Sequence, residues 1–159
     1  MEPRAAEVAE PCRAASQIFR HSFTADPHAV RTALRAALAR FTRQLAPDEA
    51  GTLELVLAEV MNNIVEHSYG DSGKGTITLS IVRDRRGLSC AVSDNGVPLP
   101  PDCLSPCLPQ MDRGTENLPE GGFGWFLIRD LTQDLGYRRE RGKNFLAFTL
   151  PLSDSNSAA

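Results

Sequence analysis

The sequence has few of the residues that mark disulfide-linked or zinc-binding proteins. Only four cysteines occur among 159 residues, and none belongs to a Cys-x-x-Cys pair. The three histidines, at positions 21, 28 and 67, are scattered. Because a structural zinc site needs Cys or His pairs at ligand spacing, we expect reduced thiols and no structural zinc.

Long apolar runs and an excess of basic residues are also missing. No apolar stretch approaches the ~20 residues that span a bilayer, and no continuous apolar segment follows Met1-Glu2-Pro3-Arg4. The 17 Lys and Arg stand against 20 Asp and Glu, a net charge of −3. Nonspecific nucleic-acid binding draws on a basic surface. We therefore expect a cytoplasmic protein that binds neither nucleic acid nor membrane.

What is present is the composition of one globular domain. Hydrophobic residues make up 42% of the chain, and a chain of this length buries roughly 68–70% of its unfolded surface without disulfide or metal support. The two ends differ from the rest: residues 1–15 have little periodicity and residues 153–159 are small and polar. We expect both ends to be disordered and residues 16–152 to form a single domain.

Two helices are predicted in the first half of the chain. Asp26-Pro27 is a start signal for the first. Its apolar face comprises Val30, Leu34, Leu38, Phe41 and Leu45. Pro47-Asp48-Glu49 opens the second, in which apolar residues recur at helical spacing from Leu53 to Ile64, and its end is expected near Tyr69-Gly70.

Alternating apolar residues predict strands in the remainder. A hairpin is expected around residues 77–81 and 88–92, with its turn at 84–87, and a second over 135–140 and 145–150, turning at 141–144. A first strand is expected at 17–23 and a third helix at about 123–134. This order predicts an α+β fold, a two-layer sandwich in which a mixed, mostly antiparallel sheet carries helices on one face.

The second helix carries a polar stripe along the edge of its apolar face. Glu59, Asn63 and Glu66 lie at i, i+4 and i+7, and His67 follows. Glu59 can accept a proton, and the amide oxygen of Asn63 suits a hard cation such as Mg²⁺. The alternative is a solvated stripe, with His67 favoured by the helix dipole.

Asp94 stands in phase with Leu88, Cys90 and Val92, so its carboxylate is expected on the apolar face of its strand, where a charge needs a partner. It could accept a hydrogen bond from the amino group of a bound base, while Gly96 lets backbone pass close to a ligand. The alternative is that Asp94-Asn95-Gly96 is simply a turn signal.

Gly121-Gly122-Phe123-Gly124 opens the third helix after a Pro-rich and Gly-rich stretch at 95–121 that has no sustained period. Glycines there free several N–H groups to face an anion at the positive end of the helix dipole. A plain loop-to-helix hinge is the alternative. A long irregular stretch inside a compact domain is more often a lid or binding loop than a mere connection.

Together these motifs resemble the nucleotide site of the gyrase, histidine-kinase and MutL ATPase superfamily. Three stretches are similar to one branch, the anti-sigma factor serine kinases of bacterial partner-switching systems: LAEVMNNIVEHSYG, VSDNGVPLP and GGFGWFLIRDLTQDLGYRRERGKNFLAFTLP. The resemblance covers roughly residues 17–152 and implies the histidine-kinase-like ATPase fold. The chain departs from the family near the last hairpin, where the family often has Gly-Thr and this chain has Gly142-Lys143-Asn144. It also lacks an obvious arginine immediately beside the glycines that open the third helix.

By this resemblance the cofactors are ATP and Mg²⁺, with Glu59 as the general base and Asn63 as a ligand of the metal. Asp94 would bind the adenine amino group and Gly96 would border the adenine. Residues 97–121 would form the lid over ATP. The remaining implied nucleotide contacts are His67, Arg113, and the backbone of Gly122, Phe123 and Gly124.

The resemblance implies an ATP-dependent anti-sigma regulatory factor. Such a protein serine kinase phosphorylates an anti-sigma-factor antagonist on a serine and binds a sigma factor or a similar partner. The resemblance also implies a homodimer. Two alternatives stay open: a nucleotide-dependent switch that binds its partner without phosphorylating it, and a detached histidine-kinase ATPase domain that would phosphorylate a histidine on another chain.

Overall fold

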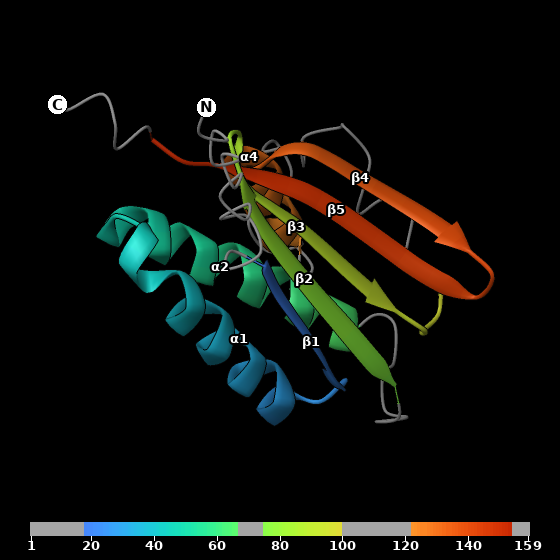
Figure 1. The fold of residues 1–159 in the computed structure, drawn as a ribbon. Coiled ribbons are helices and arrows are strands. Elements are labelled where there is room, and N and C mark those ends of the chain that lie inside the picture. The colour runs from blue at the N-terminus through green and yellow to red at the C-terminus, as the bar shows by residue number, and fades with distance from the viewer. Residues whose placement is uncertain (1–17, 67–74, 100–121, 154–159) are drawn as a thin grey trace, which may run out of the picture.

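A computed structural model of the chain describes residues 18–66, 75–99 and 122–153 (Figure 1). In chain order the elements are β1 (Ile18–Thr24), α1 (Pro27–Phe41), the short 3-10 helix η2 (Thr42–Gln44), α2 (Pro47–Ile64), β2 (Thr76–Asp84), β3 (Gly87–Asp94), α4 (Gly122–Leu131), β4 (Gln133–Glu140) and β5 (Lys143–Pro151). None of the helices in the described residues is long and apolar enough to cross a membrane.

The five strands form one sheet in the order β1-β2-β3-β5-β4. Every neighbouring pair is antiparallel, so the sheet described here has no parallel pair. The predicted α+β fold is confirmed, and the sheet is more uniform than the mixed one expected. The connection from β3 through α4 to β4 skips one strand position, so β4 lies at an edge and β5 is inserted between β3 and β4.

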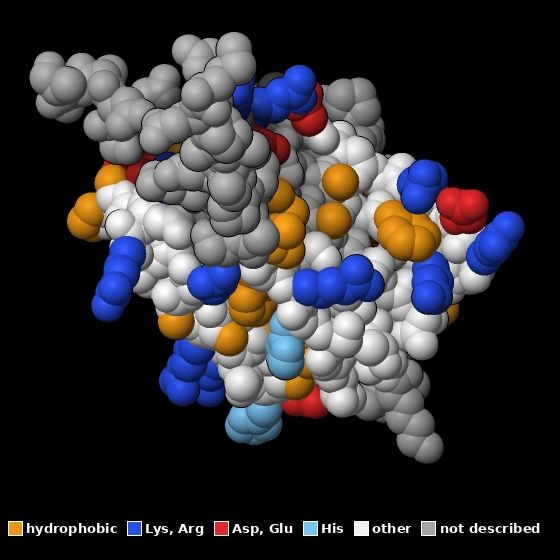
Figure 2. Space-filling model, in the orientation of Figure 1, with side chains coloured by type: hydrophobic (Ala, Val, Ile, Leu, Met, Phe, Trp, Pro, Cys, Tyr) orange, Lys and Arg blue, Asp and Glu red, His pale blue; other side chains and the backbone are white. Residues whose placement is uncertain are grey.

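One face of the sheet is apolar and covered by helices. Its buried side chains are Ile77, Leu79 and Ile81 of β2, Leu88, Cys90 and Val92 of β3, and Leu146, Phe148 and Leu150 of β5. Except at the buried Thr149, they alternate with half-buried or exposed residues, mostly small or polar, such as Ser80, Ala91 and Ala147. On the face of the molecule shown in Figure 2, hydrophobic side chains (orange) appear only in patches. The period-2 pattern of the strands therefore determines which face meets the helices.

Helix α1 lies beside α2 (Figure 1). Asp26 caps it as predicted, accepting a hydrogen bond of 2.9 Å from the backbone N–H of Ala29. Its buried face is centred on Val30, Ala33, Ala37 and Phe41, whereas Leu34, Leu38 and Leu45 are only partly buried. The expected apolar face is thus rotated toward the two alanines, because small side chains let a helix approach its neighbours closely while the larger leucines cover the margin.

Two element boundaries differ from the expected ones. Helix α4 ends at Leu131 rather than near 134, because the chain enters β4 at Gln133. The α-helical part of α2 ends at Ile64, and the expected end near Tyr69-Gly70 lies outside the described residues. Apart from Ser153, the ends expected to be disordered lie outside them too.

Both predicted hairpins form, and their turns depend on unusual backbone angles. Gly87, which opens β3, has φ +133°, and a Cβ there would lie 2.1 Å from the carbonyl oxygen of Leu150, so only glycine fits. In the second hairpin the turn is the pair Arg141-Gly142, with φ of 50° and 75°. The turn is therefore shorter than the expected 141–144, and Asn144 belongs to β5 and pairs with Asp94 of β3.

Candidate functional site

The polar stripe of α2 divides according to burial. Asn63 is only 3% exposed, Glu59 is half-buried one turn earlier, and Glu66 is exposed. The solvated-stripe alternative therefore describes Glu66 and does not describe Asn63. The Nδ2 atom of Asn63 has no hydrogen-bond partner among the described residues, although a buried amide costs free energy unless it is hydrogen-bonded.

Asp94 ends β3 with its carboxylate on the buried face, 4% exposed, as its phase with Leu88, Cys90 and Val92 predicted. Its Oδ1 accepts hydrogen bonds of 2.9 Å from the backbone N–H of Gly96 and from Nδ2 of Asn144. The turn interpretation is also correct, because the Gly96 contact is the local bond of an Asx turn. Asp94 is therefore buried, and its hydrogen bond from Gly96 fixes the direction in which the chain leaves β3.

Gly122, Phe123 and Gly124 form the first turn of α4, as expected. The last turn of this helix, with Asp130 and Leu131, lines a cavity together with Asp48 and Thr52 from the start of α2. Since α4 also packs against α2, its first turn is directed toward the other end of α2, where Glu59 and Asn63 lie. Trp125, in that first turn, is 5% exposed, and its Nε1 also has no hydrogen-bond partner among the described residues.

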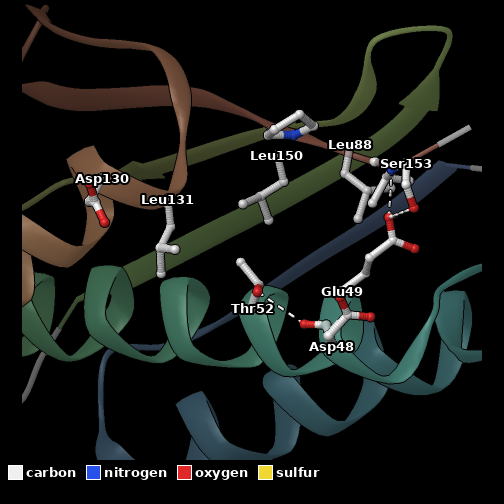
Figure 3. A pocket seen from close by; sticks show the side chains of 10 residues that line it. Asp48, Glu49, Thr52, Leu88, Asp130, Leu131, Leu150 and Ser153 are labelled. Carbon is white, nitrogen blue, oxygen red and sulfur yellow. Dashed lines mark hydrogen bonds between the residues drawn. The ribbon is translucent and has the colours of Figure 1, made fainter.

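The cavity itself, about 350 Å³ (Figure 3), is lined by none of Glu59, Asn63, Asp94 and Trp125. It is bounded by the start of α2, the end of α4 and the end of β5. From Thr52 to Asn63 the helix rises roughly 16 Å. Glu49 closes one side, because its Oε2 accepts hydrogen bonds of 2.8 and 3.1 Å from the backbone N–H and Oγ of Ser153. The cavity therefore lies between these three elements, at the end of α2 opposite to the candidate site.

The structure brings several predicted residues to one end of the molecule. Figure 1 shows the end of α2, the end of β3 and the β4–β5 turn on the same side. Glu59, Asn63, Asp94 and Gly96 come from these segments. His67, Arg113 and most of the expected lid at 97–121 lie outside the described residues.

Sequence reasoning missed three residues of the hydrogen-bond cluster that includes Asp94. Asn144 of β5 is 1% exposed, and its side chain contacts Tyr137 and Arg139 of β4 as well as Asp94. The available signal was alternation, because Asn144 stands in phase with Leu146, Phe148 and Leu150. The same argument had placed Asp94 on the buried face.

The donors at this end suit a nucleotide with its metal. The amide of Asn63 offers a hard oxygen, and rotation by 180° exchanges that oxygen with the unpartnered Nδ2. The backbone N–H groups of the first turn of α4 have no partner within their own helix and can face an anion.

The chain belongs to the histidine kinase-like ATPase domain family, whose model matches residues 23–150. This match confirms the superfamily and the fold expected from the sequence. A solved structure, the blue-light activated histidine kinase EL346 of Erythrobacter litoralis, is similar with a TM-score of 0.51 and 22% identity. The similarity covers 71% of this chain and 33% of that one, and it supports the fold alone.

The curated relatives specify the branch. The serine/threonine-protein kinase BtrW of Bordetella bronchiseptica is 35% identical over 99 residues, which are 62% of this chain and 68% of the relative. The serine-protein kinase RsbW of Bacillus mycoides is 33% identical over 104 residues, 64% of each chain. Both relatives are named as serine or serine/threonine protein kinases, and this similarity confirms the predicted class of enzyme. This chain spans about two thirds of their length.

Proposed function

We propose that this chain is an ATP-dependent anti-sigma regulatory factor. As a protein serine kinase it transfers the γ-phosphoryl group of ATP to a serine of an anti-sigma-factor antagonist, and it binds a sigma factor or a similar partner. Family membership and the kinase relatives support the general activity. The substrate and the partners come from the sequence resemblance.

The observation that carries the proposal is a pair of unpartnered buried donors. Nδ2 of Asn63 and Nε1 of Trp125 lack partners within the described parts of the chain. They lie on α2 and α4, in turns directed toward the same end of the helix pair. Buried polar groups are rarely left without partners, so a nucleotide would supply acceptor oxygens for such donors. Its metal would require the Asn63 amide to turn its oxygen to the position of Nδ2.

The residues divide the work of phosphoryl transfer, which needs positioning and charge neutralisation more than covalent help. Asp94 accepts the adenine amino group beside Gly96, and the first turn of α4 receives the phosphates with its N–H groups. Asn63 would hold Mg²⁺, which when bound would neutralise the charge of the phosphate oxygens. Glu59, one turn from Asn63, accepts the proton of the attacking serine hydroxyl. His67, Arg113 and the lid at 97–121 stay predicted contacts.

The test is a phosphotransfer assay with Mg²⁺, radiolabelled ATP and an antagonist protein that carries an acceptor serine. We expect wild type to label a serine and Glu59→Gln to lower the rate by about 100-fold, the usual contribution of a general base. Glu54→Gln is the matched control, since Glu54 is an exposed carboxylate on the same helix. No transfer by wild type, or equal transfer by Glu59→Gln, would refute the catalytic proposal.

The same assay separates the two alternatives. A histidine-kinase ATPase domain would yield an acid-labile phosphate, whereas phosphoserine survives acid. A non-catalytic switch would yield no phosphoprotein, yet its affinity for the partner, measured by calorimetry, would depend on the nucleotide. The serine kinase names of the relatives favour the acid-stable product.

A further inference from the structure

Asn144 lies at the centre of a hydrogen-bond cluster that connects β3, β4 and β5. It is the second residue of β5, directly opposite Asp94 in the β3–β5 pair. Its side chain is buried and contacts residues from both neighbouring strands as well as the segment that leaves β3.

Each end of the Asn144 amide has partners of one kind only. Nδ2 donates to Oδ1 of Asp94 at 2.9 Å and to the carbonyl oxygen of Val97 at 2.8 Å. Oδ1 accepts from Nη1 of Arg139 at 2.9 Å and from the Tyr137 hydroxyl. Since a carboxylate and a carbonyl only accept, and a guanidinium only donates, the amide has a single satisfactory orientation.

The cluster also binds the backbone of three of the four residues that follow Asn95. Gly96 donates its N–H to Asp94, and its carbonyl oxygen accepts from Arg139 at 3.0 Å. Val97 is held through its carbonyl oxygen by Asn144, and the N–H of Leu99 donates to the Tyr137 hydroxyl at 3.2 Å. A segment without regular secondary structure is therefore fixed by β4 and β5.

We propose that Asn144 is a positioning residue for base recognition. It holds the Asp94 carboxylate and the Gly96–Val97 backbone in one arrangement, while Tyr137 and Arg139 hold the Asn144 amide. This inference rests on the proposed function, in which Asp94 receives the amino group of adenine.

The physical consequence is selectivity for adenine over guanine. Adenine presents an amino group where guanine presents a carbonyl oxygen, and a carboxylate held at that point attracts the first and repels the second. If the carboxylate can turn away, the attraction weakens and the repulsion is relieved. Loss of Asn144 should therefore weaken ATP binding while GTP binding stays the same or improves.

The experiment measures dissociation constants of fluorescent mant-ATP and mant-GTP, each with Mg²⁺, for wild type, Asn144→Ala and Tyr137→Phe. We expect Asn144→Ala to weaken mant-ATP binding about tenfold, the equivalent of one hydrogen bond to a charged group, and to reduce the ATP-to-GTP preference by at least as much. Tyr137→Phe, a smaller change at a half-buried position, should act in the same direction by about threefold.

Asn62→Ala is the control, because it removes an exposed amide from α2 outside the cluster. If both nucleotides weaken equally in both cluster variants, the cluster has a structural role only and the inference is wrong. An unchanged ATP-to-GTP ratio in folded Asn144→Ala or Tyr137→Phe would also overturn it. If wild type binds neither nucleotide, the proposed function itself fails and the inference with it.

Discussion

In the described parts of the chain, the buried polar side chains of Asn63, Asp94 and Asn144 interrupt the apolar layer between sheet and helices. Asp94 and Asn144 satisfy each other, whereas Nδ2 of Asn63 has no partner among the described residues. An unsatisfied buried group costs about 1–3 kcal/mol. In the proposed function this difference has a purpose: the protein itself holds the Asp94–Asn144 pair in place, whereas the amide of Asn63 would be satisfied by the ligand.

Cys90 is the buried residue with the clearest chemical consequence. Burial raises the pKa of its thiol from 9.0 to about 12. In a variant with Cys12, Cys103 and Cys107 replaced by serine, we expect Cys90 to stay unreactive toward a disulfide reagent at pH 8, because only the thiolate reacts. The same protein in guanidinium chloride should react fully. Rapid modification of the native variant would contradict the prediction.

This raised pKa also has a defined effect on stability. The folded state favours the protonated thiol, so the contribution of Cys90 is complete below 9.0 and is lost as pH rises from there to about 12. Replacement by alanine should remove that part of the pH dependence, which urea unfolding at a series of alkaline pH values would detect.

At the scale of elements, the start of α2 is joined to the end of β5 by Glu49. Its Oε1 accepts a hydrogen bond of 2.9 Å from the N–H of Ala46, and its Oε2 binds Ser153. Ala46 has no side-chain acceptor, so only half of a capping box forms. Glu49 therefore carries both the helix cap and the closure of the sheet onto the helix layer.

Replacing this carboxylate should destabilise the protein in a pH-dependent manner. The hydrogen bond from the backbone of Ala46 is the main cause that lowers the pKa of Glu49, and the bonds from Ser153 add to it. Its stabilisation is therefore present above 4.5 and is lost as pH falls through the lowered folded-state pKa. We expect Glu49→Gln to cost about 0.5 kcal/mol at pH 7, because the amide keeps an acceptor oxygen but loses the negative charge at the helix N-terminus, measured by urea unfolding.

The cost should shrink as the wild-type carboxyl group is protonated, and Glu54→Gln should have little effect at any pH because Glu54 is exposed. A cost for Glu49→Gln that is the same at pH 7 and pH 3 would show that charge at this position is unimportant.

At the scale of the whole molecule, charges are arranged unevenly despite the net charge of −3. Figure 2 shows Lys and Arg side chains gathered where β4 and β5 turn. Arg138 there lies 3.5 Å from Glu140 and stacks over the ring of Phe145, while Arg139 belongs to the cluster around Asn144. The basic turn thus adjoins the end of the molecule to which we assign the nucleotide.

Binding of a nucleotide at this end should stabilise the folded protein as a unit. A ligand at 100 times its dissociation constant adds about 2.7 kcal/mol, which corresponds to roughly 5–10 °C in the thermal midpoint of a protein of this size. We expect ATP with Mg²⁺ to raise the midpoint of wild type by this amount and Asp94→Asn to lose most of the shift. An equal shift in both proteins would locate the nucleotide elsewhere.

Local pattern alone determined the elements of this protein. The start signals Asp26-Pro27 and Pro47, the spacing of apolar residues in α2, and the alternation in β2, β3 and β5 each reflect which side of a single element faces the core. The burial of Asp94 followed from the same alternation. Where such patterns failed, at the end of α4 and in the length of the last turn, neighbouring segments in the fold set the boundary.

Only the tertiary structure decided which distant residues meet. Asn144 contacts Asp94 across 50 positions, and Ser153 contacts Glu49 across 104. These contacts depend on the insertion of β5 between β3 and β4, and no local period encodes strand order. Periodicity shows which side of a single element is buried. A site shared by several elements depends instead on how all of those elements pack against one another.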